Sequence, residues 1–139
     1  MKSELKPGLE FEHRFKLNEN KMVPALYPEA PEFQEMPQVF GTGFMVGFLE
    51  WACLKAVIPY LDWPDEQTVG THVNFSHVSA TPSGQEVVAK GKLIEIDGRR
   101  LVFEVEGYDE QGLISQGTHE RFVINRKRFE ASLAKKKPD

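Results

Sequence analysis

The chain has little of what a disulfide scaffold, a zinc protein or a nucleic-acid-binding protein needs. Its single cysteine, Cys53, excludes an internal disulfide and indicates a reducing compartment. A formal net charge of −4 argues against a nucleic-acid surface, which requires a basic patch. The basic run 135–137 near the end is expected to be a solvated tail. No two of the four histidines have the spacing of metal ligands, so we expect no metal site.

Signals for export and for phosphate binding are also missing. The N-terminal segment MKSELKPGLEFEHRF has no apolar stretch of the kind that a secretory signal needs, so we expect a cytoplasmic, soluble protein. There is no glycine-rich phosphate loop, no alternation of strands with helices and no internal repeat. A chain of 139 residues that is 40% hydrophobic and 27% charged has the length and composition of one globular domain.

The most apolar stretch of the chain, residues 43–61, contains one acidic residue, Glu50. This run is about as long as a membrane span, but it also contains Lys55 and is broken by Pro59, so we interpret it as a buried core helix. No rotation of that helix moves Glu50 to a polar face. An ionised carboxylate buried without a partner is costly, so Glu50 must be hydrogen-bonded or protonated. Such a local conflict is expected at a functional site.

The rest of the sequence predicts strands joined by turns. Apolar and charged residues alternate over 9–17, as in a half-buried strand. A connection rich in proline, 18–40, forbids a long regular element, and its apolar residues indicate a loop that folds back over a site. After the helix, strands are expected at 69–77, 87–96, 101–106 and 113–124, with a turn at Asp97–Gly98 and a basic, weakly helical segment from Asn125.

This order of elements predicts an α+β fold in which an antiparallel sheet wraps around one long helix. A helix that is apolar on all sides needs cover over most of its surface. One sheet covers one side of the helix, so we expect a second copy of the chain to cover the rest and form a homodimer.

Four residues around the helix are candidates for chemistry, each with a structural alternative. Thr42 is either the N-cap of the helix or a hydroxyl presented at a helix N-terminus, where negative charge is favoured. His77 is either a core histidine or a general base. Arg121 is either a solvent-facing edge charge or a bidentate partner for a carboxylate or phosphate. Gly70 marks either a bulge or a close backbone approach to a ligand. The remaining histidines, at 13, 72 and 119, are less informative.

Three stretches together resemble a known family. They are LYPEAPEF with MPQVFGTGFMVGFLEWAC, then GTHVNFSHVSATP, then SQGTHERFVI. They are similar to the fluoroacetyl-CoA thioesterases, which have the hotdog fold. The similarity runs from Pro7 to about Phe129. It implies one hotdog thioesterase domain over residues 1–139, in which 126–139 are a basic, partly helical tail. It also implies a homodimer with active sites near the subunit interface.

The resemblance implies hydrolysis of a short-chain acyl-CoA thioester, and no cofactor apart from the CoA of the substrate. It implies a catalytic group in which His77 is the base while Thr42 and Glu50 position or activate the attacking group. The residues implied to bind substrate are Gly70, Arg121, Phe33 and Met36. The fluoroacetyl-specific member carries phenylalanine in its lid at the position of Met36. The sequence therefore does not identify the acyl group, and fluoroacetyl is one candidate.

Two other functions remain open at this point. Another hotdog enzyme, such as an acyl-thioester hydratase or dehydratase, would also use a histidine with a carboxylate. A non-catalytic acyl-CoA-binding module would keep the pocket without needing the threonine, glutamate and histidine.

Overall fold

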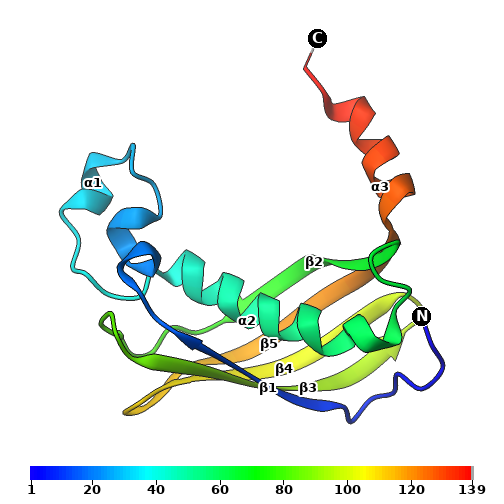
Figure 1. Ribbon diagram of the computed structural model, residues 1–139, viewed down its shortest axis with the longest axis horizontal. Helices are drawn as coiled ribbons and strands as arrows, with labels where there is room; N and C mark the ends of the chain where they lie inside the picture. The colour runs from blue at the N-terminus through cyan, green and yellow to red at the C-terminus, as the bar shows by residue number, and fades with distance from the viewer. Residues whose placement is uncertain (139) are drawn as a thin grey trace.

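The computed structural model describes residues 1–138, which form one antiparallel sheet with a long helix across it (Figure 1). The strands are β1 (Glu10–Lys16), β2 (Glu66–Phe75), β3 (Glu86–Asp97), β4 (Arg100–Asp109) and β5 (Gly112–Asn125). The α-helices are α1 (Pro31–Gln34), α2 (Thr42–Val57) and α3 (Arg126–Ser132), with 3-10 turns η1 (Glu19–Lys21), η2 (Val23–Ala25), η3 (Ile58–Tyr60) and η4 (Leu133–Lys136). The predicted order of strand, loop, helix and four strands is confirmed, and the fold is the hotdog fold.

The sheet has the strand order β1-β3-β4-β5-β2, so β1 and β2 are its two edges. Every neighbouring pair is antiparallel. Strands β3 and β4 are joined by the predicted tight turn, where Gly98 has φ of 60°, a value that glycine adopts without steric cost. Of the predicted site residues, Gly70 lies on the β2 edge and Arg121 on the neighbouring strand β5.

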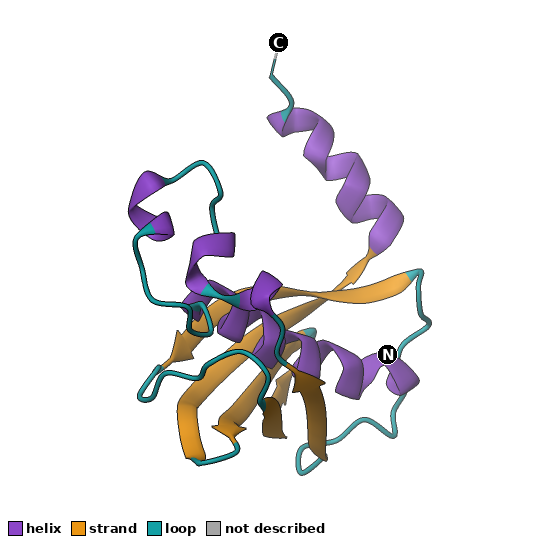
Figure 2. Ribbon diagram, turned by 60° about the vertical axis from the view of Figure 1, so that its left-hand side comes forward, coloured by secondary structure: helices purple, strands orange, loops and turns teal. Residues whose placement is uncertain are grey.

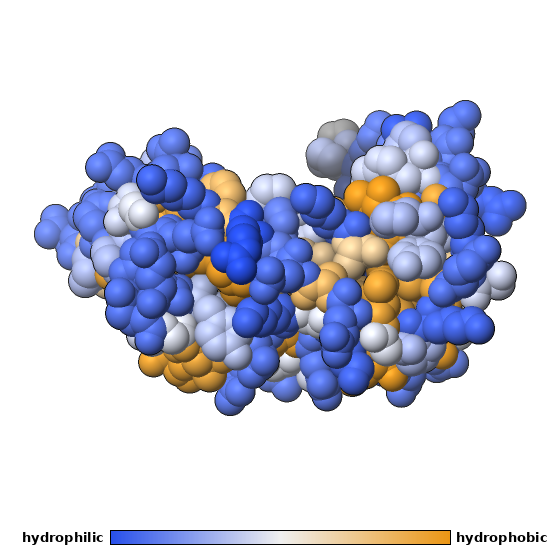
Figure 3. All heavy atoms as spheres, turned by 60° about the horizontal axis from the view of Figure 1, so that its bottom comes forward, coloured by the Kyte–Doolittle hydropathy of each residue, from blue (hydrophilic) through white to orange (hydrophobic). Residues whose placement is uncertain are grey.

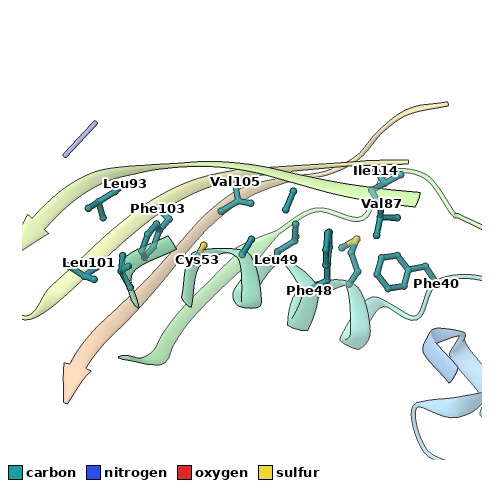
Figure 4. Packing of buried hydrophobic residues seen from close by; sticks show 14 of the residues in the cluster. Phe40, Phe48, Leu49, Cys53, Val87, Leu93, Leu101, Phe103, Val105 and Ile114 are labelled. Atoms are coloured by element: carbon teal, nitrogen blue, oxygen red, sulfur yellow. The ribbon is translucent and has the colours of Figure 1, made fainter. Parts of the chain in front are cut away.

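Helix α2 packs its apolar side onto the concave face of the sheet. The side chains of α2 that are buried there are Met45, Phe48, Leu49, Ala52, Cys53 and Val57. Figure 4 shows Phe48, Leu49 and Cys53 pointing toward the sheet, which contributes Phe103 and Val105. Each large apolar side chain buried in this way stabilises the fold by about 1.5–3 kcal/mol. By length and composition alone, Thr42–Tyr60 would also suit one membrane span; here it is the core helix, as predicted.

The opposite side of α2 is only partly covered within this chain. Gly43, Gly47, Trp51 and Lys55, spaced by four residues, remain exposed along the helix. Leu26 lies against Gly43, and the Trp51 ring lies against His13. Glu50 is only half-buried. Figure 3 shows a notch between the end of the molecule that carries α1 and the end that carries α3. The sheet therefore covers one side of the helix only, as the sequence indicated.

The proline-rich connection forms only short helical pieces, and with α3 it projects away from the sheet (Figure 2). Its base is tied to the core by main-chain bonds from Val23 N to Val39 O and from Gly41 N to Lys21 O, both 2.9 Å. Leu26 packs against the first turn of α2 so closely that a Cβ at Gly43 would lie 2.9 Å from its side chain. The connection is therefore anchored at the N-terminal end of α2.

Two details of the predicted strand 69–77 are wrong. A bulge between Gly70 and His72 breaks the alternation of faces that the sequence indicated. The strand also ends at Phe75, so His77 lies in the segment after β2 and not within it. That segment stays beside β5, because Val78 N donates to Ile114 O at 2.8 Å.

Candidate active site

Thr42 and His77 are hydrogen-bonded at the start of α2. The N-cap of the helix is Gly41, without a side-chain bond, so the interpretation of Thr42 as the N-cap is wrong. Thr42 is the first helical residue, and its Oγ1 lies 2.8 Å from His77 Nδ1. Since N–H groups in the first turn of a helix lack intrahelical acceptors, negative charge is favoured beside this pair.

The imidazole of His77 is half-buried. Burial lowers the pKa of His77 below its usual 6.5, and the nearby Ser79 main chain offsets only part of that effect. Its Nε2 is buried and has no hydrogen-bond partner within residues 1–138. A neutral ring at pH 7 has a free lone pair, which is the state that a general base requires.

Glu50 lies on α2, eight residues after Thr42, and is ion-paired with Arg121. Glu50 Oε1 accepts a hydrogen bond of 2.7 Å from Arg121 Nη1. The expectation that Glu50 is hydrogen-bonded is thus confirmed. The alternative in which Arg121 is a solvent-facing edge charge is wrong, because β5 lies inside the sheet and Arg121 is only 3% exposed. The Glu50 side chain, in contrast, remains 39% exposed.

Gly70 lies against this ion pair, opposite Arg121 in the β2–β5 register. A Cβ at Gly70 would lie 2.7 Å from Glu50 Oε1, closer than real Cβ contacts. The bulge predicted at Gly70 is therefore confirmed, because it begins next to this residue, whereas a close approach of a ligand stays a prediction.

Two further residues hold Arg121, and sequence reasoning missed both. Thr68 accepts from Arg121 twice: Nε donates to Oγ1 at 2.7 Å and Nη2 donates to the carbonyl oxygen at 2.8 Å. His119 Nε2 lies 3.1 Å from Arg121 Nη1. The period-two pattern of β5, which puts His119 and Arg121 on one face, was the signal that could have identified His119.

The three predicted catalytic residues are thus divided between two places along α2. Thr42 pairs with His77 at the start of the helix, and Glu50 pairs with Arg121 farther along it. Eight residues of helix correspond to a rise of about 12 Å between Thr42 and Glu50. Within residues 1–138, no hydrogen bond joins the Thr42–His77 pair to the Glu50–Arg121 pair. Both pairs lie on the side of the molecule that carries the β2 segment and its continuation.

The predicted lid residues lie at the Thr42 end of α2. Phe33 is part of α1, half-buried, with its ring 6.1 Å from the ring of Tyr27. Met36 follows α1 and is 49% exposed. Figure 1 shows α1 standing beyond the first turn of α2. The structure therefore puts these side chains near the helix start but leaves Met36 uncovered.

A hollow of about 990 Å³ lies across strands β1, β3, β4 and β5, away from both pairs, and is open to solvent. Half of its lining residues are charged: Glu10, Glu12, Lys90, Lys92, Glu104 and Glu106. No group of three or more metal-ligating side chains is present among residues 1–138.

The chain is similar to thioesterases over nearly its whole length. A family described as fluoroacetyl-CoA-specific thioesterase matches residues 25–127. A fluoroacetyl-CoA thioesterase from Streptantibioticus cattleyicolor is 45% identical over 138 residues, 99% of each chain. A solved fluoroacetyl-CoA thioesterase has a TM-score of 0.93 at 45% identity, covering 96% of this chain and 98% of that one. A phenylalanine-to-alanine variant of such an enzyme, solved with fluoroacetate and CoA, has a TM-score of 0.87 at 46% identity, covering 90% and 99%.

Proposed function

The chain belongs to the fluoroacetyl-CoA-specific thioesterase family, and we propose that it hydrolyses a short-chain acyl-CoA thioester to the free acid and CoA. In the structure, the observation that carries this proposal is the 2.8 Å contact between Thr42 Oγ1 and His77 Nδ1 at the N-terminus of α2. It joins a hydroxyl, a base and a positive helix end, which together suit attack on a thioester carbonyl.

The proposed chemistry gives each residue of the catalytic group one task. His77 takes the proton of the attacking oxygen and returns it to the thiolate of CoA as the carbon–sulfur bond breaks. Free N–H groups at the start of α2 stabilise the negative charge that develops on the carbonyl oxygen. Glu50 lies about 12 Å along α2 from Thr42, so we assign it the orientation of the attacking group in a site that a second copy of the chain completes, through the oxygen that Arg121 leaves free.

The attacking oxygen can come from water or from the Thr42 hydroxyl. In the first route water adds directly to the carbonyl carbon. In the second, Thr42 Oγ1 displaces CoA and forms an ester that water then cleaves, with His77 as base in both steps. Both routes consume one water and yield the acid and free CoA, so neither needs a metal or an added cofactor.

A homodimer formed along the β2 edge would complete the site. From Thr68 to Phe75 this edge strand carries no lysine, arginine, aspartate or glutamate, and Val73 is 47% exposed. The other edge, β1, has a charged residue at every second position, which discourages strand pairing. A second copy paired along β2 would face the half-exposed Glu50 and the partly covered side of α2.

The acyl group is expected to be small, and we propose that Phe33 and Met36 cover it from the α1 segment. The relative with 45% identity is named for fluoroacetyl-CoA. Methionine at position 36 fills space less rigidly than phenylalanine, so we propose that acetyl- and propionyl-CoA are accepted with fluoroacetyl-CoA.

The test is release of CoA thiol from acetyl-, fluoroacetyl-, propionyl- and longer acyl-CoA esters by the purified protein. We expect kcat/KM to be highest for acyl groups of two or three carbons. Thiol release from none of these esters would reject the proposal. Bound acyl-CoA without turnover would make the protein a binding module, and a changed double bond in an enoyl-CoA would make it a hydratase.

A further inference from the structure

The Arg121 guanidinium is held on all sides by protein acceptors. It is 3% exposed, and four of its hydrogen bonds are formed within the chain: two to Thr68, one to Glu50 and one to His119. A guanidinium has five N–H donors in one plane. With four of them engaged, both the position and the tilt of that plane are fixed, and so is the position of the Glu50 oxygen bonded to it.

His119 can hold Arg121 in one tautomer only. Its Nδ1 lies 2.7 Å from the carbonyl oxygen of His72, so Nδ1 must carry the proton and donate it. Nε2 is then the lone-pair nitrogen and accepts from Arg121 Nη1. The ring is fully buried, and this burial, together with Arg121, lowers the pKa of His119 and keeps the ring neutral.

Strand β2 therefore holds Arg121 through hydrogen bonds from residues on both sides of Gly70. Thr68 stands two residues before Gly70 and holds Nε and Nη2 directly. His72 stands two residues after Gly70, beyond the bulge, and holds Nη1 through the ring of His119. Gly70 itself, without a side chain, leaves room for the Glu50 carboxylate between them.

We propose that Thr68 and His119 are positioning residues of this enzyme, which orient Glu50 through Arg121 and do not touch the acyl-CoA. This inference rests on the proposed thioesterase function. Without the Thr68 hydroxyl, Arg121 Nε–H is buried and unpaired, and the guanidinium tilts toward another acceptor. Nη1 moves with it and carries Glu50 Oε1 out of place.

A purely structural role would not account for the cost of this arrangement. Removing an arginine from water costs several kcal/mol, and an apolar side chain at position 121 would fill the face of β5 without that cost. Two residues from two strands, Thr68 and His119, nevertheless converge on the guanidinium, and among residues 1–138 its one hydrogen bond to α2 is to the half-exposed Glu50. The network thus ends at the group that faces the substrate.

The test compares Thr68→Val with Thr68→Ser, in the wild-type protein and in the Glu50→Gln variant. Valine keeps the shape of threonine and removes the acceptor, whereas serine keeps the hydroxyl. We expect Thr68→Val to lower kcat about tenfold or more with KM nearly unchanged, and Thr68→Ser to stay within about threefold of wild type. In the Glu50→Gln background, Thr68→Val should lower kcat by no more than about twofold, because the two changes act on one unit.

Thr71→Val is the matched control. Thr71 lies in the same strand, and its hydroxyl donates to Glu120 O at 3.2 Å, a bond that does not involve Arg121. Thr71 shares the β2 edge with Thr68 but forms no hydrogen bond with Arg121 among residues 1–138, so kcat should fall much less than in Thr68→Val. His119→Phe is the second variant; it keeps a ring beside Phe75 and removes both hydrogen bonds, and it decides the question if Thr68→Val does not fold.

Full kcat in folded Thr68→Val or His119→Phe would overturn the inference. So would an equal fractional loss in the wild-type and Glu50→Gln backgrounds, which would show that Thr68 acts independently of Glu50. Failure of the proposed function itself looks different: the wild-type protein would then release thiol from none of the acyl-CoA esters.

Discussion

Adding one methyl group at Gly70 should separate catalysis from stability. In Gly70→Ala the new Cβ would lie 2.7 Å from Glu50 Oε1, 3.3 Å from His119 Cε1 and 3.4 Å from Arg121 Nη1. The first contact is closer than real Cβ contacts, so the carboxylate must retreat by roughly 0.5–1 Å, and the second is tighter than most, so the His119 ring must also shift slightly. Gly70 has no positive φ, so alanine adds no backbone strain.

The loss of catalytic rate should be larger than the loss of stability, because the group that has to move is the Glu50 carboxylate. The Glu50 carboxylate is the end of a flexible, 39% exposed side chain, so its displacement should cost less than about 1 kcal/mol of stability. A catalytic group displaced by about 1 Å can lose about 100-fold in rate. We therefore expect kcat to fall about 10- to 100-fold, with the melting temperature lowered by no more than a few degrees.

The assay is steady-state thiol release, with a thermal melt of the same preparation. The control is Gly47→Ala, on the exposed side of α2, where a Cβ would meet nothing within 4 Å. That variant should keep its kcat and gain about 0.5–1 kcal/mol of stability, since glycine weakens a helix interior. Wild-type kcat in Gly70→Ala would refute the placement of the Glu50 carboxylate against this backbone.

Three further outcomes are expected. His77→Ala should lower kcat by about 100-fold or more with the fold intact, because it removes the general base; turnover within threefold of wild type would make His77 a core residue. Met36→Phe should raise the ratio of kcat/KM for fluoroacetyl-CoA over acetyl-CoA, since one apolar contact is worth only about 1–3 kcal/mol of discrimination; an unchanged ratio would show that position 36 does not select the acyl group. Burial lowers the pKa of His13, His77 and His119 below 6.5, so the unfolded chain binds more protons than the folded chain just below that pH. The free energy of unfolding, measured by urea titration, should therefore be greatest above pH 6.5 and fall toward about pH 5; a flat profile would contradict the lowered pKa values of these histidines.

The sequence predicted the fold well because its apolar pattern is simple. The run around Glu50 carries one carboxylate that no helical rotation removes from an apolar face, so both the core helix and a hydrogen-bonded carboxylate followed from one observation. The hairpin at Asp97–Gly98 followed from turn chemistry in the same way. These features depend on neighbours in the sequence, and local rules are sufficient for them.

The features that sequence reasoning missed depend on partners far along the chain. Thr42 fits an N-cap by local rules, but its hydroxyl bonds to His77, 35 residues away. His119 looked uninformative because its role needs Arg121 on one nitrogen and the His72 carbonyl, 47 residues away, on the other. The bulge after Gly70 shifts the register of β2, so a strict period of two assigns the following residues to the wrong faces.

The hydrogen bonds that Arg121 forms with Thr68 and Glu50 also link the local opening of edge strand β2 to ligand binding at Glu50. Edge strands open locally more easily than central ones, and amide hydrogen exchange reports that opening. Opening β2 near Thr68 releases Arg121, so the strand cannot fray while Glu50 stays in place. A ligand that binds only the ordered Glu50 should therefore slow deuterium uptake at the amides of Thr68–His72.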